Sequence, residues 1–270
     1  MAALAPAYPL PVDIRLMNVT AFVLAAIGGV ALAALALMWV TRWPVFAVQR
    51  ITVEGDLAHN SVLTIRANAA PKLAGNFFTI DLGAGRRAFE SVPWVRQAVV
   101  RRVGPNRLRV QLQEHRAVAL WANAARADEP ADKLVNSFGE VFEANLGDVE
   151  DDAMATLRGP EGASARMLAL LTRLQPEMAK IDANIETLEL SGRGSWRVVL
   201  DIGAEVELGR GSDDELIART RRFVSTLPDV KGLYQQHPLL SADLRHNEGY
   251  AVRLKGVSTS AEPAAKPQKK

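Results

Sequence analysis

One uninterrupted apolar run limits the architectures that this chain of 270 residues can adopt. From Val19 to Val40 the sequence reads VTAFVLAAIGGVALAALALMWV, with Thr20 as its one polar residue and no charged residue. About 20 apolar residues in a helix, rising about 1.5 Å each, cross the ~30 Å hydrocarbon core of a bilayer. The run therefore predicts a single transmembrane helix near the N-terminus, because a helix inside a soluble domain is rarely apolar on all sides.

A cleaved signal peptide is the alternative interpretation of this run. The apolar part of a signal peptide is about 7 to 15 residues long and ends at a cleavage site of small residues. The present run is longer, and it closes with Trp39, Arg42 and Trp43, a combination typical of anchors at the membrane interface. We therefore predict an uncleaved signal anchor over residues 19–43.

The charges beside the span do not decide its orientation. Asp13 and Arg15 precede it, and Arg42 and Arg50 follow it, so the excess of positive charge that marks a cytoplasmic side is nearly absent. Long C-terminal domains cross the membrane largely regardless of flanking charge. We therefore predict a cytoplasmic tail over residues 1–18 and place everything after the span outside the cytoplasm.

Composition excludes several functional classes for the rest of the chain. The sequence has no cysteine, which removes disulfides, thiol catalysis and cysteine metal sites. Its four histidines lack metal-ligand spacing, no serine lies in a nucleophile motif, and the glycine pairs do not form a phosphate-binding loop. We therefore predict no enzyme active site, no cofactor and no metal. A net charge of +2 does not demand a nucleic acid partner.

The residues after the span predict a small domain with the order strand, helix, helix, strand, strand. Apolar alternation in VFAVQRITVEGD predicts the first strand, and NSVLTIRANAAPKL and LGAGRRAFESV predict two short helices. The stretch WVRQAVVRRVGPNRLRVQLQEH predicts a hairpin with a turn at residues 104–106, because Leu108, Val110 and Leu112 then alternate with polar residues.

Four arginines gather on this predicted hairpin: Arg101, Arg102, Arg107 and Arg109. No aromatic residues lie among them to stack on nucleic acid bases, so a solvated sheet face is the simpler interpretation. Contact with anionic lipid is the alternative, because the membrane span lies close in the sequence.

A second α+β domain is predicted over residues 117–256. The pattern indicates a hairpin in KLVNSFGEVFEA, a helix in ASARMLALLTRLQPEM, three strands in IETLELSGRGSWRVVLDIGAEVELG, and a second helix that begins with a capping box of Ser212 and Glu215. The stretch ADLRHNEGYAVRLKG predicts two strands joined by a turn, followed by a disordered tail over residues 257–270. Because we find no β-α-β alternation in this pattern, we predict a mainly antiparallel sheet.

Several of these motifs resemble the bacterial cell-division family FtsQ/DivIB. ITVEG, NFFTIDL and FESVPWVRQAVVRRVGPNRLRVQLQEHRAVALW, and later LVNSFGEVF and VELGR, stand in the family's order and at its distances. The resemblance runs from the anchor to about Lys255, and residues 44–116 are similar to the family's POTRA module (β-α-α-β-β). Gly104 departs from the family pattern, which commonly has a bulky residue before the proline of this hairpin.

The resemblance implies a non-enzymatic connector of the divisome, the machinery of cell division, held in the inner membrane at the septum. It implies that FtsB, which brings FtsL, adds a strand to the last strand of the chain, while other divisome proteins bind the POTRA module. The implied partner-binding residues are Arg245, His246, Asn247, Glu248, Gly249, Tyr250, Ala251, Val252, Arg253 and Leu254. Among them, Arg245 matches a family arginine that can pair with an acidic residue of the partner.

Two alternatives remain open from the residues themselves. An edge strand that is merely blunted by Arg253 and Lys255 would bind nothing. A POTRA-type envelope protein that handles client polypeptides in secretion or outer-membrane assembly is the other alternative, although no series of alternating strands of about 10 residues, typical of a membrane barrel, follows.

Overall fold

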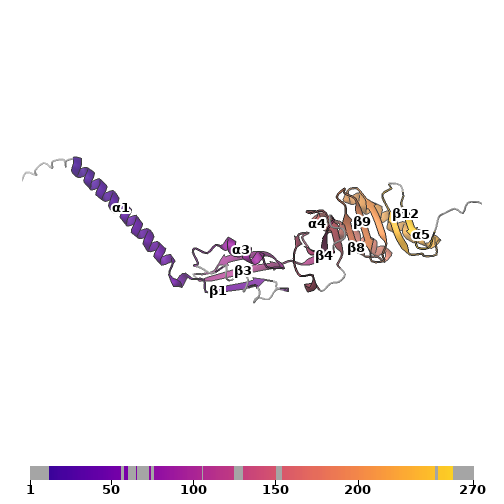
Figure 1. Ribbon diagram of the computed structural model, residues 1–270, viewed down its shortest axis with the longest axis horizontal. Helices are drawn as coiled ribbons and strands as arrows, with labels where there is room; N and C mark the ends of the chain where they lie inside the picture. The colour runs from indigo at the N-terminus through magenta and orange to yellow at the C-terminus, as the bar shows by residue number, and fades with distance from the viewer. Residues whose placement is uncertain are drawn as a thin grey trace, which may run out of the picture. The chain divides into compact units, whose positions relative to one another are not determined.

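The computed structural model of the chain describes residues 12–55, 58, 59, 65, 73, 76–104, 106–124, 130–149, 154–246 and 249–257. The chain divides into two compact units, Met1–Gln113 and Glu114–Lys270, and several elements of each are labelled in Figure 1. The first part of the predicted N-terminal tail, residues 1–11, and residues 258–270 of the predicted disordered tail lie outside the described residues.

The first unit begins with one long helix, α1 (Val12–Thr41). Its 30 residues span about 45 Å at about 1.5 Å per residue, more than the ~30 Å hydrocarbon core requires. The stretch Asp13–Thr41 is long and apolar enough to cross a membrane, and its apolar part is not buried within the structure. α1 therefore fits the predicted transmembrane helix, with Asp13 and Arg15 in its first turns.

A three-stranded sheet follows α1 and the short 3-10 helix η1 (Pro44–Phe46). Its strands are β1 (Arg50–Gly55), β2 (Val95–Arg102) and β3 (Arg107–Glu114), in the order β1-β3-β2, and β1 runs parallel to β3. β3 buries every second residue, as the sequence predicts, because only one side of the strand faces the core.

Helical segments cover this small sheet. α3 (Leu82–Glu90) begins after Asp81, whose carboxylate accepts hydrogen bonds from the backbone N–H groups of Gly83 and Ala84 at 2.8 and 3.0 Å. Ile65, predicted as an inward residue of the preceding helix, is helical and fully buried. Most of that predicted helix lies outside the described residues.

The four arginines of the β2–β3 hairpin are exposed, as predicted. One of them also holds a neighbouring segment, because Arg102 donates to the backbone carbonyls of Phe77 and Ile80 at 2.8 and 3.0 Å. Another, Arg109, lies 3.3 Å from the carboxylate of Glu54 on β1. At least one of these arginines therefore makes a structural contact that the sequence pattern did not predict.

The second unit is built on a mixed sheet, with nine described strands in the order β12-β11-β10-β9-β8-β7-β4-β5-β6. The strands are β4 (Ala117–Asn123), β5 (Lys133–Asn136), β6 (Val141–Phe142), β7 (Thr156–Gly159), β8 (Ile185–Leu190), β9 (Trp196–Leu200), β10 (Glu205–Gly209), β11 (Leu239–Asp243) and β12 (Ala251–Leu254). The pairs β4–β7, β7–β8 and β10–β11 are parallel, and the other neighbouring pairs are antiparallel. Short 3-10 helices, η3 (Leu146–Asp148) and η4 (Ala179–Ile181), complete the unit.

Two β-α-β units lie within this sheet, and the prediction that no such alternation occurs was wrong. Helix α4 (Ser164–Met178) connects β7 to the parallel strand β8, and α5 (Asp213–Leu233) connects β10 to the parallel strand β11. The first unit was missed because β7 is only four residues long and its sequence, TLRG, carries little strand signal. The α+β class holds, since antiparallel pairs join the two units and form both ends of the sheet.

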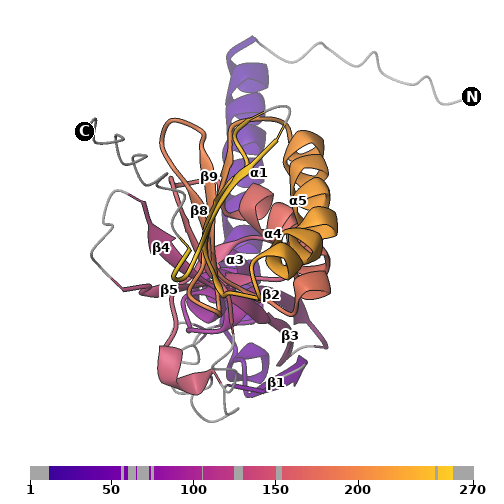
Figure 2. The same ribbon diagram turned by 90° about the vertical axis from the view of Figure 1, so that its right-hand side faces the viewer.

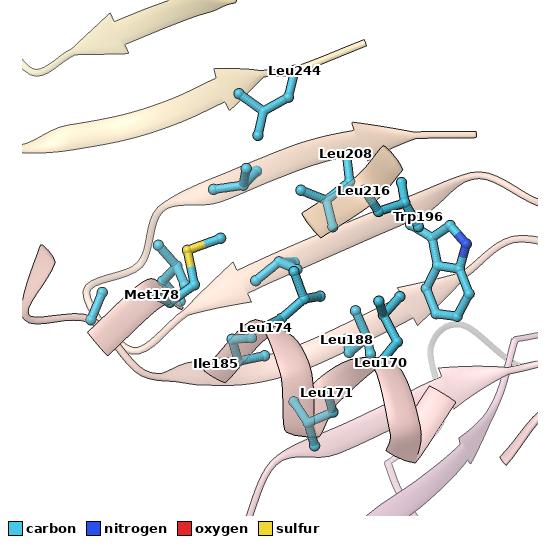
Figure 3. Close-up of a cluster of buried hydrophobic side chains, with 14 of the residues drawn as sticks. Leu170, Leu171, Leu174, Met178, Ile185, Leu188, Trp196, Leu208, Leu216 and Leu244 are labelled. Atoms are coloured by element: carbon cyan, nitrogen blue, oxygen red, sulfur yellow. The ribbon is translucent and has the colours of Figure 1, made fainter. Parts of the chain in front are cut away.

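Both helices pack on one face of the sheet (Figure 2). Met167, Leu170, Leu171 and Leu174 of α4 are buried as predicted, and so are Leu216, Ile217, Thr220, Phe223 and Val224 of α5. Opposite them lies a row of cross-strand partners on β7 to β11, all buried in the same core: Leu157, Leu188, Val198, Val206 and Ala242. Figure 3 shows part of this core, with side chains of α4 directed at those of the strands.

The capping box of α5 leads to a stability prediction. Ser212 Oγ accepts from the N–H of Glu215 at 3.3 Å, and the Glu215 carboxylate accepts from the N–H of Ser212 at 2.9 Å. We expect Ser212→Ala to lower the free energy of unfolding by about 1 kcal/mol, because a helix N–H loses its partner. Urea unfolding of the full chain in detergent, followed by tryptophan fluorescence, measures this loss.

The control lies in the same helix. Ser225 is exposed in the middle of α5, so Ser225→Ala should change the free energy of unfolding by less than about 0.5 kcal/mol. Equal effects of the two substitutions would contradict a capping role for Ser212.

Candidate partner-binding edge

The last strand of the chain lies at one edge of the large sheet. β12 pairs antiparallel with β11, and no other described strand pairs with it. The register places Ala251 opposite Asp243, Val252 opposite Ala242 and Arg253 opposite Ser241. The two strands that the sequence predicted are therefore present, and one side of β12 is open among the described strands.

One hydrogen bond determines which backbone groups of β12 face outward. The N–H of Lys255, just after the strand, donates to the carbonyl of Pro238 at 2.9 Å, so the backbone of Lys255 faces β11. The N–H and C=O groups of successive residues in a strand point to opposite sides. Ala251 and Arg253 therefore also face β11, and the N–H and C=O groups of Val252 and Leu254 face away from the sheet.

The side chains of β12 point alternately to the two faces of the sheet. Leu254 is buried, and Val252, the partner of the core residue Ala242, is half-buried against the same core. Ala251 and Arg253 are exposed on the opposite face, which carries no helix. The helix-side contacts hold the strand in register, because a shift by one residue would expose Val252 and Leu254.

The segment that leads into β12 is fixed to α5. The ring of Tyr250 meets that of Phe223 edge to face, with centroids 5.3 Å apart, and its hydroxyl lies 2.6 Å from Thr226 Oγ1. Phe223 is fully buried. Tyr250, a predicted partner-binding residue, is therefore half-buried and contributes to the position of the strand.

The guanidinium group of Arg245 is bound to Asp243, two residues before it. Its Nε donates to Oδ1 and Oδ2 at 2.9 and 3.0 Å, and its Nη2 donates to Oδ2 at 2.5 Å. These hydrogen bonds from Arg245 lower the pKa of Asp243 to about 2. The Arg245 side chain is still 60% exposed, and among the described residues its Nη1 has no hydrogen-bond partner.

Gly209, at the end of β10, leaves room for this arginine. Its φ of +80° lies in the left-handed region, and a Cβ added there would come within 2.8 Å of Arg245 Cγ. A side chain at this position would therefore both strain the turn and displace Arg245.

A basic cavity of about 560 Å³ lies at this end of the sheet. It is lined by Ser191, Arg193, Ser195, Gly209, Arg210, Arg219 and Arg245. Arg219 donates to the carbonyls of Leu208 and Arg210 at 3.0 and 2.7 Å and so closes the end of β10. The side chains of Arg193 and Arg210 form no ion pair with the described residues, so the cavity attracts anionic groups.

Comparison with known proteins identifies the family of this chain. Residues 119–245 match the family model described as cell division protein FtsQ/DivIB, C-terminal, and residues 46–115 match the POTRA domain, FtsQ-type. The chain is 39% identical over 252 residues to the cell division protein FtsQ of Thiomonas arsenitoxydans, covering 92% of this chain and 90% of the relative. It is 38% identical over 246 residues to FtsQ of Burkholderia pseudomallei, covering 91% and 94%.

This chain belongs to the FtsQ/DivIB family. The resemblance seen in the sequence is thereby confirmed, together with a POTRA domain and a relation to cell division. The names of these FtsQ relatives describe cell division proteins and do not indicate an enzyme class.

The described binding residues predicted for this FtsQ-family chain fall into three groups. Arg245 and His246 are exposed after β11, Gly249 and Tyr250 precede β12, and the remaining predicted residues from Ala251 onward form β12 itself. Asn247 and Glu248 lie outside the described residues.

The sequence analysis missed three residues that position the edge. Asp243 binds Arg245, Thr226 contacts the hydroxyl of Tyr250, and Gly209 leaves space for Arg245. Gly209 lies within the family motif VELGR and Asp243 within the stretch ADLRHNEGYAVRLKG, so both stood in segments that the sequence analysis had marked. No local signal marked Thr226, because its contact joins residues 24 positions apart in the chain.

The Asp243–Arg245 pair predicts a pH dependence of stability. A carboxyl group with a lowered pKa stabilises the fold above its unfolded pKa of about 3.9, and this contribution disappears as the pH falls through the folded value. With a folded pKa of about 2, Asp243→Asn should lower stability at pH 7 by on the order of 1 kcal/mol after solvent screening. The difference from the parent should shrink between about pH 4 and pH 2.

Urea unfolding at a series of pH values measures this difference. Arg245→Ala is the matched control, because Asp243→Asn in that background should produce a much smaller pH-dependent loss. A loss that stays constant from pH 7 to pH 3 in the parent background would contradict the assignment.

Proposed function

We propose that this chain is a non-enzymatic connector of the divisome that docks FtsB, and FtsL with it, along the open edge of β12. The observation that carries the proposal is the pair of outward-facing backbone groups at Val252 and Leu254. A partner in extended conformation could bond to the N–H and C=O of Val252 and to the N–H of Leu254, and so extend the sheet. The C=O of Leu254 already accepts from the N–H of Val257 at 3.3 Å. Binding of this kind requires no catalytic group.

The rigidity of the edge supports this proposal. Leu254 is buried, Tyr250 contacts both Phe223 and Thr226, and the ladder to β11 fixes the register. A strand that is already ordered loses little conformational entropy when a partner binds, so more of the interaction energy contributes to affinity.

The charges at the start of β12 indicate an acidic partner. Arg245 retains a free Nη1, and Arg193 and Arg210 line the adjacent cavity without a described ion partner. A partner segment that continues past the start of the strand would meet these cations. We propose that a carboxylate of the partner binds there and shares Arg245 with Asp243.

The anchor and the two units complete the proposal. We propose that residues 1–18 are cytoplasmic, that 19–43 span the inner membrane, and that the POTRA module (44–116) and the distal domain (117–256) lie in the periplasm at the septum. The POTRA module would bind other divisome proteins. The apolar helix α1 and the family membership support this arrangement.

Proline substitution at the edge tests the docking mode. Val252→Pro removes one outward N–H without removing a hydrogen bond of the β11–β12 ladder. We expect it to weaken binding of FtsB from the same organism by at least tenfold, measured by titration of the full chain in detergent. Cooperative unfolding of the distal unit should be retained.

Two matched variants separate the backbone from the side chain. Val252→Ala keeps the N–H and should bind within about threefold of the parent, whereas Ala251→Pro removes an inward N–H and should lower the stability of the sheet. Unchanged FtsB binding by a folded Val252→Pro variant would refute docking at this edge.

Reporter fusions test the proposed topology. We expect alkaline phosphatase fused after Lys270 to be active, since that enzyme folds only outside the cytoplasm, and a cytoplasmic reporter at the same point to be inactive. The same pair fused after Asn18 should give the opposite result. Activity of the cytoplasmic reporter at the C-terminus would overturn both the topology and the divisome proposal.

A further inference from the structure

Arg253 is the one cation of β12, and it projects from the open face of the sheet at the edge itself. Its cross-strand neighbour on β11 is Ser241, which carries no charge. The side chain of Arg253 forms no ion pair or hydrogen bond with the described residues. Asp243, the acidic residue of β11 one step further along the same face, is already bound by Arg245.

Several charges on this face are paired across the strands. One row of cross-strand partners runs Arg158, Glu189, Arg197, Glu207 and Asp243 from β7 to β11. Arg158 lies 3.7 Å from Glu189, and Arg197 lies 3.9 Å from Glu189 and 2.6 Å from Glu207. From β7 to β10 each strand thus supplies the counter-charge for the next one, whereas Asp243 lies beside the like-charged Glu207 and is paired by Arg245. No described strand lies beyond Arg253 at this edge.

A strand added to β12 would place one of its residues directly beside Arg253. The added strand bonds to the outward backbone groups of Val252 and Leu254, and Arg253 lies between them. In an antiparallel pairing this is a non-hydrogen-bonded position, where the Cα atoms are about 4.5 Å apart and the side chains are closest. Opposite charges at such a position attract, and like charges repel.

We propose that Arg253 selects a docking strand that carries an aspartate or glutamate at the position beside it. The inference rests on the proposed function and adds to it the charge pattern of the partner strand. The acidic residue would give Arg253 a cross-strand partner of opposite charge, as Glu189 and Glu207 give Arg197. A strand with lysine or arginine at this position would be rejected.

The competing role for Arg253 is protection of the edge against self-association. An exposed cation on an edge strand opposes pairing of two copies along that edge, because the positive charges of the two copies would repel each other. That role predicts that loss of the charge promotes oligomers and leaves FtsB affinity unchanged. The selective role predicts that the affinity for FtsB depends on the sign of the charge at position 253.

A charge series at position 253 distinguishes the two roles. Affinity of the full chain in detergent for FtsB from the same organism is measured for the parent, Arg253→Gln and Arg253→Glu. We expect roughly 2- to 5-fold weaker binding for Arg253→Gln and a loss of at least about tenfold for Arg253→Glu. The loss for Arg253→Glu should shrink in 0.5 M salt, because an exposed pair is screened.

Arg116→Glu is the matched control. Arg116 is exposed just before β4, which lies six places from β12 in the strand order, so the same change in net charge should leave affinity within twofold of the parent. A reciprocal test changes each acidic residue of the FtsB docking segment to lysine in turn. One of these changes should restore binding to Arg253→Glu.

The outcomes separate this inference from the function on which it rests. If Val252→Pro abolishes binding while Arg253→Glu binds within twofold of the parent, edge docking stands and selection by Arg253 is overturned. If Arg253→Gln forms oligomers with unchanged FtsB affinity, protection of the edge is the role of Arg253. If Val252→Pro binds like the parent, the docking mode itself is wrong.

Discussion

The packing of α4 and α5 on a single face of the large sheet is the constraint on which the rest of the distal domain depends. On each strand the residues that face the helices must be apolar, as in the row that runs from Leu157 on β7 to Ala242 on β11. The residues between them along each strand therefore point to the opposite face. The two helices are joined at Glu177, a buried carboxylate of α4 that accepts from Arg221 of α5 at 2.8 Å and from Lys180 at 2.5 Å. These donors keep the pKa of Glu177 below its usual value, so the buried carboxylate remains charged and paired.

The position of the last strand follows from the same packing. α5 presents Phe223 and Thr226 to Tyr250, and the core accepts Leu254, so β12 has both of its ends fixed before any partner arrives. An edge strand is ordinarily a hazard, because its unpaired backbone invites pairing with other copies. Here the exposed part is short and carries a cation, which suits selective binding better than indiscriminate pairing.

One-sided packing also explains the charges of the open face. Residues that face away from the helices meet water, so they are free to be ionic, and from β7 to β10 the register brings opposite charges together. Such exposed pairs contribute little stability individually. Together with Arg253 and the arginines around the basic cavity, they nevertheless set the electrostatic environment in which an added strand would lie.

Much of this architecture was predictable from local patterns in the sequence. The apolar run of α1, the alternation of β3 and the capping box of α5 each depend on neighbours in the chain, and each was predicted from them. The family resemblance was likewise carried by short contiguous motifs such as VELGR. Where an element was too short to show a pattern, as in β7, the prediction failed, and with it the recognition of the first β-α-β unit. The elements of the second unit were predicted, but the parallel pairing of β10 with β11 was not.

The edge itself could be located but not described from the sequence. ADLRHNEGYAVRLKG shows two strands and a turn, and it marks Arg245 and the last strand as candidates. Which backbone groups face outward depends on the bond from Lys255 to Pro238, and the surroundings of Arg245 depend on Gly209, 36 positions earlier in the chain. The sequence determined the elements because local propensity and periodicity act between neighbours; only the tertiary structure decided the face, the register and the free charge of β12, because these arise from contacts between distant segments.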